Sequence, residues 1–158
     1  MMYLWLALFT AAAAGADQLA KYLVVRNIPL GAQIPVLPGV VHLTHVRNTG
    51  AAFSMLSGQT WVFFAATGAF FLLAAVAVTR KWLKGNAQLW AAAAVCGGAL
   101  GNLIDRLTNA YVVDMIEVEF MHFAVFNVAD CFITVGAVVL VLAVLLEGKK
   151  GHASRSGS

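Results

Sequence analysis

The sequence predicts an all-α integral membrane protein with four transmembrane helices, a small outward-facing β-sheet and a closing loop on the membrane surface. Three observations support this fold class. Hydrophobic residues make up 61% of the 158 residues and charged residues only 11%, and the mean hydropathy is +0.85, which is too apolar for a soluble domain. Four apolar stretches are each close to the length of a membrane span. The segments that follow the first and third stretches are rich in β-branched residues.

The four stretches define the predicted spans. About 20 residues cross the hydrocarbon core, and the stretches near this length are residues 3–25, 60–78, 87–107 and 130–146. The first contains an Ala-rich segment that resembles a signal-peptide cleavage region, but no basic residue precedes it and the apolar run continues to Val25. We therefore expect a retained helix. We expect residues 1–147 to form one domain and residues 148–158 to form a disordered cytoplasmic tail.

The basic residues predict the orientation in the membrane. The link between the second and third stretches contains Arg80, Lys81 and Lys84, and the C-terminal tail contains three more basic residues. Because cytoplasmic loops are enriched in Lys and Arg, we expect both termini in the cytoplasm and the loops 26–59 and 108–129 outside. The net charge of +3 is thus explained by topology. No basic patch with interleaved aromatic residues indicates nucleic-acid binding.

Both outward loops contain segments typical of strands. Residues 40–46 are rich in β-branched residues and follow Pro38 and Gly39. Residues 113–120 alternate in character, so Asp114 and Ile116 are expected on one side of a strand. We expect a small sheet on the membrane surface, with the second loop mobile enough to close over it.

Charged residues within the spans gather at one depth, near the outward ends. Asp17 precedes Lys21 by one helical turn, a favourable spacing for an ion pair, and Asn102 shares a helix face with Asp105 and Arg106. Ionisable groups in a membrane are costly unless they are paired or hydrated, so they are candidate functional residues. A structural alternative stays open for Asp17, Lys21 and Asp105, because paired charges also fix helix register.

Two further aspartates lie at the same depth. Asp130 opens the fourth stretch, where Asn127 is a candidate N-cap and Asp130 would occupy position N3. A capping box is therefore the structural alternative for Asp130, but it does not explain Asp114 in the nearby strand. Two adjacent carboxylates share a proton and provide an acid and a base. Such a pair hydrolyses an amide with an activated water, without a metal or covalent intermediate. The helix dipole favours Asp130 as the ionised member.

Other chemistry has less support in the sequence. His42 and His45 are three residues apart in a predicted strand and so point to opposite faces, which is poor for a metal site. Cys96 and Cys131 lie in apolar stretches and are expected to be buried thiols. A serine nucleophile paired with Lys21 stays open by residue type, with Ser54 and Ser57 as candidates.

Two other function classes are compatible with a membrane protein of this kind. A proton-coupled transporter needs polar residues across the whole depth, whereas the second stretch has only Thr67 and the cytoplasmic halves of the others carry no charge. A structural protein would use Asp114 and Asp130 as anchors, and their replacement by Asn would then destabilise the fold.

Five short segments occur in a specific order along the chain. They are residues 17–21, 48–53, 97–106, 112–114 and 126–130. In these segments the sequence resembles the lipoprotein signal peptidases, or signal peptidase II, which are membrane aspartyl proteases of bacteria. The resemblance extends from the first span to the fourth and leaves the tail outside.

The resemblance implies a function and a set of site residues. The family removes signal peptides from diacylglyceryl-modified prolipoproteins at the cytoplasmic (inner) membrane, cuts before the lipidated cysteine, needs no cofactor and is inhibited by globomycin. A monomer suffices for this chemistry. The resemblance implies Asp114 and Asp130 as the catalytic pair. It implies that the surrounding shell contacts substrate or supports the pair, with Asn48 and Arg106 as the main substrate contacts. This shell is Asp17, Lys21, Asn48, Gly50, Asn102, Asp105, Arg106 and Asn127.

Overall fold

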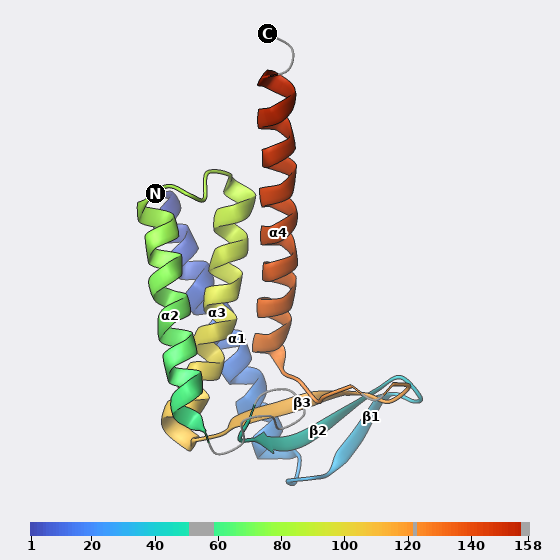
Figure 1. Ribbon diagram of the computed structural model, residues 1–158. Helices are drawn as coiled ribbons and strands as arrows, with labels where there is room; N and C mark the ends of the chain where they lie inside the picture. Colours follow the sequence, from blue (N-terminus) through green and yellow to red (C-terminus); the bar gives the residue numbers. More distant parts are fainter. Residues whose placement is uncertain (51–58, 122, 156–158) are drawn as a thin grey trace.

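The computed structural model describes residues 1–50, 59–121 and 123–155. Four helices and three strands make up this part of the chain (Figure 1). In chain order they are α1 (Met2–Asn27), β1 (Gln33–Leu37), β2 (Val41–Asn48), α2 (Thr60–Thr79), α3 (Asn86–Asn109), β3 (Val112–Val118) and α4 (Val128–Arg155). The predicted combination of four helices with a small sheet is confirmed.

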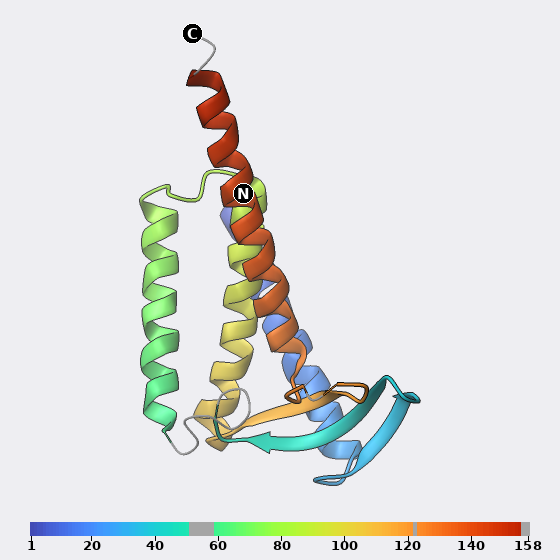
Figure 2. The same cartoon turned by 45° about the vertical axis from the view of Figure 1, so that its right-hand side comes forward.

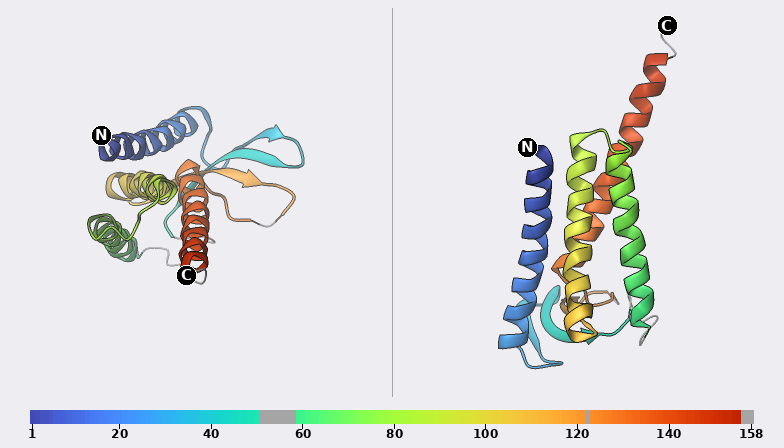
Figure 3. Two further views of the ribbon diagram at one scale, coloured as in Figure 1. Left: turned by 90° about the horizontal axis from the view of Figure 1, so that it is seen from above. Right: turned by 90° about the vertical axis from the view of Figure 1, so that its left-hand side faces the viewer.

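Helix α3 is the centre of the helical part and contacts α1, α2 and α4. Seen along the helices, α1, α3 and α2 form a row, and α4 and the sheet lie on the same side of that row (Figure 3). The sheet lies across one end of the helices, and the N-terminus lies at the other end (Figure 1). Helix α4 is tilted and extends beyond the others at its C-terminal end (Figure 2). We call the end with the sheet the sheet end.

Within the described part of the chain, three helices are long and apolar enough to cross a membrane, over Trp61–Thr79, Asn86–Asn109 and Val128–Glu147. Helix α1 has 26 residues and a length of about 39 Å at 1.5 Å per residue, enough for a fourth span. Asp17 and Lys21 lie within this helix. Both side chains are buried against neighbouring segments, with exposed fractions of 0% and 3%, so the charges do not face lipid.

Glycines allow α3 to approach its neighbours closely. A Cβ atom at Gly98 would meet the backbone oxygen of Ala129 at the start of α4, and one at Gly101 would meet the Asp17 carboxylate 2.5 Å away. The absence of side chains at these positions therefore brings α1, α3 and α4 together at the sheet end, where the polar residues gather.

The sheet is antiparallel in the order β1-β2-β3. Leu43 of β2 lies opposite Ile34 of β1 and Ile116 of β3. Because side chains alternate along a strand, Asp114 of β3 points to the same face as Ile116. Val113 and Met115 alternate with Asp114 and are buried on the opposite face, in a core with Val24 and Ile28. The sheet thus directs Asp114 away from this core, and its side chain reaches the start of α4.

Two segments differ from expectation. Residues 33–37 form an additional strand around Pro35, which an edge strand tolerates because one side of its backbone needs no partner. Helix α4 begins two residues earlier than predicted and continues to Arg155, so it enters the segment for which we expected a disordered tail. Lys149 and Lys150 are good helix formers and allow this continuation. The division into a domain and a tail stays a prediction.

Candidate active site

The start of helix α4 is capped as the sequence predicted. The Asp130 backbone N–H donates to Asn127 Oδ1 over 3.0 Å, and the Asn127 backbone N–H donates to Asp130 Oδ2 over 3.1 Å. This reciprocal pair is a capping box with Asn127 at the N-cap and Asp130 at N3. Asn127 is fully buried. The cap fixes the position of Asp130 and orients the Asn127 side chain.

Asp114 projects from β3 to the same cap. Its carboxylate accepts hydrogen bonds from Asn127 Nδ2 over 2.7 Å and from Asn48 Nδ2 of β2 over 2.8 Å. Burial of this side chain raises the pKa of Asp114 to about 6, the two amide hydrogen bonds oppose the rise, and the negative charge of Asp130 adds to it. Asp114 is therefore a carboxyl group that can be protonated near neutral pH.

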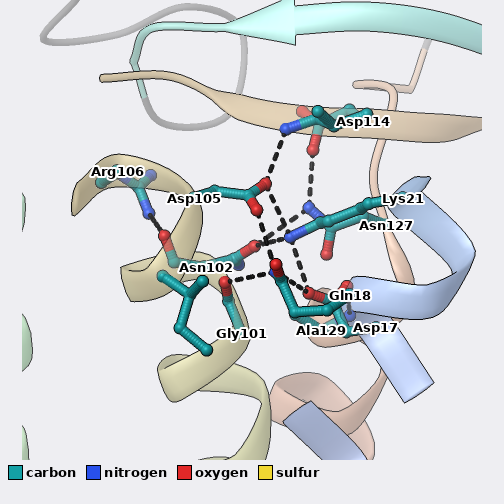
Figure 4. A network of polar contacts seen from close by, with 12 residues as sticks. Asp17, Gln18, Lys21, Gly101, Asn102, Asp105, Arg106, Asp114, Asn127 and Ala129 are labelled. Carbon is teal, nitrogen blue, oxygen red and sulfur yellow. Dashed lines mark hydrogen bonds and ion pairs between the residues drawn. The ribbon is translucent and has the colours of Figure 1, made fainter. Parts of the chain in front are cut away.

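Asn102 of α3 joins the two aspartates to the rest of the site (Figure 4). Its Nδ2 donates to Asp130 Oδ1 over 2.9 Å, and its Oδ1 accepts from Asn127 Nδ2 over 3.1 Å. The same Oδ1 accepts from Lys21 Nζ of α1 over 3.0 Å. Three helices and two strands thus meet at a continuous network of hydrogen bonds.

A buried charge cluster lies behind Asn102. Lys21 Nζ is 2.7 Å from Asp17 Oδ2 and 3.0 Å from Asp105 Oδ2. Asp17 Oδ1 also accepts from the Ala129 backbone N–H over 2.9 Å, and Asp105 Oδ2 accepts from the Val113 backbone N–H over 2.9 Å. Asp17 thereby holds the first turn of α4, and Asp105 holds β3 next to Asp114. These contacts support the structural role that the sequence left open for both residues.

The end of α3 also helps to position β3. Ala110 follows the last residue of α3 and has φ 63°, the left-handed conformation, with its N–H bonded to the Arg106 carbonyl oxygen. This residue ends the helix and turns the chain directly into β3.

A cavity of about 550 Å³ opens beside the two aspartates. Most of its polar lining comes from side chains that the sequence singled out, Asn48, Asn102, Arg106, Asp114, Asn127 and Asp130, and Thr134 of α4 adds to them. Most of the remaining lining is apolar, including Phe123, Val125, Phe126, Val135 and Cys131. The cavity therefore suits a ligand with a polar centre and an extended apolar part.

Arg106 lies at the border of this cavity. Its Nη1 donates to the Asn102 carbonyl oxygen and its Nη2 to the Gly50 carbonyl oxygen, each over 3.3 Å. The guanidinium also lies over the Phe63 ring of α2, 4.3 Å from its centroid. The Gly50 N–H in turn donates to Asn48 Oδ1 over 2.9 Å. Arg106 thus keeps N–H groups available toward the cavity.

The structure brings together all ten site residues predicted from the sequence. It adds Gln18, whose Nε2 donates to Asp105 Oδ1 over 2.9 Å and to the Gly101 carbonyl oxygen over 3.1 Å. It also adds Phe63, through its contact with Arg106. Gln18 lies beside Asp17 in the first motif, so the sequence could have identified it as a site residue. Phe63 lies in an apolar helix, where no sequence pattern distinguishes it from its neighbours.

The other chemical candidates lie elsewhere. His42 of β2 pairs with Glu119, which follows β3, whereas His45 is buried against the Ile28 carbonyl oxygen. Among residues 1–50, 59–121 and 123–155, no three His, Cys, Asp or Glu side chains are grouped so that they could hold a metal ion. Ser54 and Ser57 lie outside the described residues, as do 51–53 of the second motif.

Comparison with known proteins decides between the function classes. The family described as signal peptidase (SPase) II matches residues 9–146. The chain belongs to the signal peptidase II family. Signal peptidase II is an aspartic peptidase, so the chain is an enzyme rather than a transporter or an assembly protein.

Individual relatives agree with the family assignment. The lipoprotein signal peptidase of Brevibacillus brevis is 41% identical over 149 residues, which cover 94% of this chain and 100% of the relative. The lipoprotein signal peptidase of Trichormus variabilis is 44% identical over 149 residues, which cover 94% of this chain and 92% of the relative.

Solved structures confirm the fold of this signal peptidase II. One bacterial membrane enzyme is 28% identical with a TM-score of 0.86, over 92% of this chain and 90% of that one. A second bacterial membrane enzyme is 30% identical with a TM-score of 0.81, over 89% of this chain and 92% of that one. The protein is therefore a bacterial multi-pass membrane protein.

Proposed function

We propose that this signal peptidase II removes signal peptides from bacterial prolipoproteins by cutting before a cysteine that carries diacylglycerol. Curated relatives named lipoprotein signal peptidases support the substrate class. The observation that carries the mechanism is the pair Asp114 and Asp130, both hydrogen-bonded to Asn127 beside a mainly apolar cavity. A lipidated peptide has the matching combination of a polar amide and long apolar chains.

In this mechanism Asp130 is the base and Asp114 the acid. Asp130 lies at the N-terminus of α4 and accepts from Asn102, and both features favour its carboxylate form. Asp114, with a pKa of about 6, is available in its protonated form near neutral pH.

The proposed reaction balances without a covalent enzyme intermediate. Asp130 takes a proton from water as the water oxygen bonds to the scissile carbonyl carbon, and Asp114 gives its proton to the carbonyl oxygen. Asp130 then protonates the amide nitrogen as the C–N bond breaks, and Asp114 recovers its proton from the new hydroxyl group. The products are the signal peptide with a free carboxyl group and the lipoprotein with a free α-amine on its cysteine.

The surrounding residues take two roles in the proposal. Asn48 and Arg106 border the cavity and present N–H groups that can bind substrate carbonyl oxygens, with Gly50 fixing both. Asp17, Lys21, Asn102, Asp105 and Asn127 hold the aspartates in place. No cofactor takes part. Globomycin-like inhibitors would bind in the same cavity, and the loop after β3 would close over it. A monomer is sufficient.

The proposed orientation places the sheet end outside the cytoplasm. The link between α2 and α3 contains Arg80, Lys81 and Lys84 and lies at the end opposite the sheet. The positive-inside rule assigns that end to the cytoplasm. Both termini are then cytoplasmic, and the active site faces outward at the inner membrane, where water and the membrane-held substrate meet.

A cleavage assay with two matched substrates tests the proposed substrate class. Purified enzyme in detergent or lipid is given the same prolipoprotein with and without diacylglycerol on its cysteine, and the products are identified by mass spectrometry. We expect cleavage of the lipidated form alone, with cysteine as the new N-terminal residue. Equal cleavage of both forms, or a cut at another bond, would contradict the proposal.

A further inference from the structure

We propose that Lys21 is a positioning residue that controls the catalytic pair through Asn102. The proposal rests on the proposed function, since it assumes that Asp130 is the base. Lys21 lies outside the cavity lining formed by the described residues, and its link to Asp130 runs through the Asn102 amide. Its role is to determine which end of that amide faces the carboxylate.

The orientation of the Asn102 amide follows from donor and acceptor chemistry. A lysine ammonium only donates, so the group of Asn102 that faces Lys21 Nζ at 3.0 Å has to be the oxygen Oδ1. The NH₂ group then faces Asp130 Oδ1 at 2.9 Å and donates to it. The reversed amide would place NH₂ against the ammonium and the amide oxygen against the carboxylate, and both contacts would be repulsive.

Asn127 is oriented from the opposite side of the site. Its Oδ1 accepts from the Asp130 backbone N–H, which also only donates, so its Nδ2 faces Asp114 Oδ1 at 2.7 Å and Asn102 Oδ1 at 3.1 Å. Lys21 and the α4 N-terminus thus fix one consistent direction of hydrogen-bond donation, in which each amide donates to one aspartate. Without Lys21, or without the backbone N–H at the start of α4, the two amide groups could rotate into the reversed orientation.

Lys21 itself is held firmly. Its exposed fraction is 3%, and the three donors of the ammonium match three acceptors, on Asp17, Asp105 and Asn102. The two carboxylates are in turn fixed by the backbone N–H groups of Ala129 and Val113. The ammonium is therefore a rigid reference point for the Asn102 amide.

Charged groups around Asp130 come from every neighbouring element. Helix α1 contributes Asp17 and Lys21, α3 contributes Asp105 and Arg106, and β3 contributes Asp114, while the Cys131 thiol follows on α4 itself. The Lys21 charge also acts on Asp114 through space and lowers the pKa of that group. A test has to separate this direct effect from the effect through Asn102.

The variant Lys21→Met keeps the length of the side chain and removes its donors. We expect kcat toward a lipidated prolipoprotein to fall about tenfold, the effect of one charge-assisted hydrogen bond, with little change in KM because Lys21 is not part of the cavity wall. The acidic limb of the pH profile of kcat should move about one unit to higher pH, because a rotated Asn102 no longer stabilises the carboxylate of Asp130.

Gln18→Met is the matched control. Gln18 donates to Asp105 at 2.9 Å and to Asp17 at 3.4 Å, two acceptors that it shares with Lys21, but within the described part of the chain it forms no hydrogen bond with Asn102. We expect this variant to lose stability without a shift of the acidic limb. An unmoved acidic limb in Lys21→Met, an equal shift in Gln18→Met, or a change confined to the basic limb would overturn the proposal.

A second variant covers the case in which Lys21→Met does not fold. The double variant Lys21→Met/Asp105→Asn removes the ammonium together with one of its two carboxylate partners. Its pH profile of kcat is compared with that of Asp105→Asn alone. We expect the acidic limb of the double variant to lie about one unit higher in pH than that of Asp105→Asn. Failure of the double variant to fold as well would make Lys21 a folding residue and contradict the proposal. Retained activity in Asp130→Asn would instead refute the proposed mechanism, whatever the behaviour of Lys21.

Discussion

At the scale of single residues, the two aspartates differ because their surroundings differ. Asp114 is buried in a strand and receives two amide donors, whereas Asp130 stands at a helix N-terminus with its own capping contacts. Burial disfavours the charged form, and a helix N-terminus favours it. The same side-chain type can therefore serve as an acid in one position and as a base in the other.

Asn48 offers a test of the Asp114 environment. Its hydrogen bond favours the ionised form of Asp114 and lowers the pKa of that group. In Asn48→Ala the pKa should rise further above about 6. Because the acid has to be protonated, activity should then persist to higher pH, and we expect the basic limb of the kcat profile to move up by about one unit.

The control for this prediction is Arg47→Ala on the same strand. Arg47 lies over the Tyr111 ring, 4.9 Å from its centroid, outside the cavity lining of the described residues. We expect the pH profile of kcat in Arg47→Ala to be the same as that of the wild type. A basic limb that stays unchanged or moves to lower pH in Asn48→Ala would show that Asp114 is not the acid.

At the scale of elements, the site depends on how closely α3 approaches the start of α4. The hydrogen bond of 2.9 Å between Asn102 and Asp130 spans these two helices. Gly98 permits the approach, because a Cβ atom at this position would collide with the Ala129 backbone oxygen and the Ile133 side chain. A backbone contact of this kind cannot move aside as a flexible side chain can.

The variant Gly98→Ala should therefore separate the helices. We expect a loss of stability of about 1–3 kcal/mol and a strong loss of cleavage, measured by thermal unfolding in detergent and by the rate on a lipidated prolipoprotein. Gly68→Ala on α2 is the matched control, since an added Cβ there would meet no other segment of the described residues within 4 Å. It should keep full activity. Wild-type stability and activity in Gly98→Ala would contradict this description of the packing.

At the scale of the whole molecule, the sequence predicted the elements better than their contacts. Hydropathy located the four helices to within two residues at most ends, and local capping chemistry identified Asn127. The strand around Pro35 was missed because proline argues against a strand unless the edge position is known. The link from Lys21 to Asn102 joins residues 81 apart in sequence, and no local pattern encodes such a contact.

The distribution of polar groups agrees with a reaction at one membrane surface. Asp17, Lys21, Asn102, Asp114 and Asp130 lie within one network at the sheet end. Sequence reasoning recognised their common depth and the Asp17–Lys21 pair within one helix, but not the contacts between different helices and strands. Depth follows from hydropathy, whereas contacts follow from the rotation of each helix about its axis, which side-chain packing determines.

The central claim is that Asp114 and Asp130 carry out the hydrolysis, and two conservative variants test it most directly. Asp114→Asn and Asp130→Asn are purified, their folding is compared with that of the wild type by thermal unfolding, and single-turnover cleavage of a lipidated prolipoprotein is measured. We predict folded proteins in which cleavage is about a thousandfold slower or absent, in line with the contribution of a general acid or base. Near-normal cleavage by either folded variant would contradict the account.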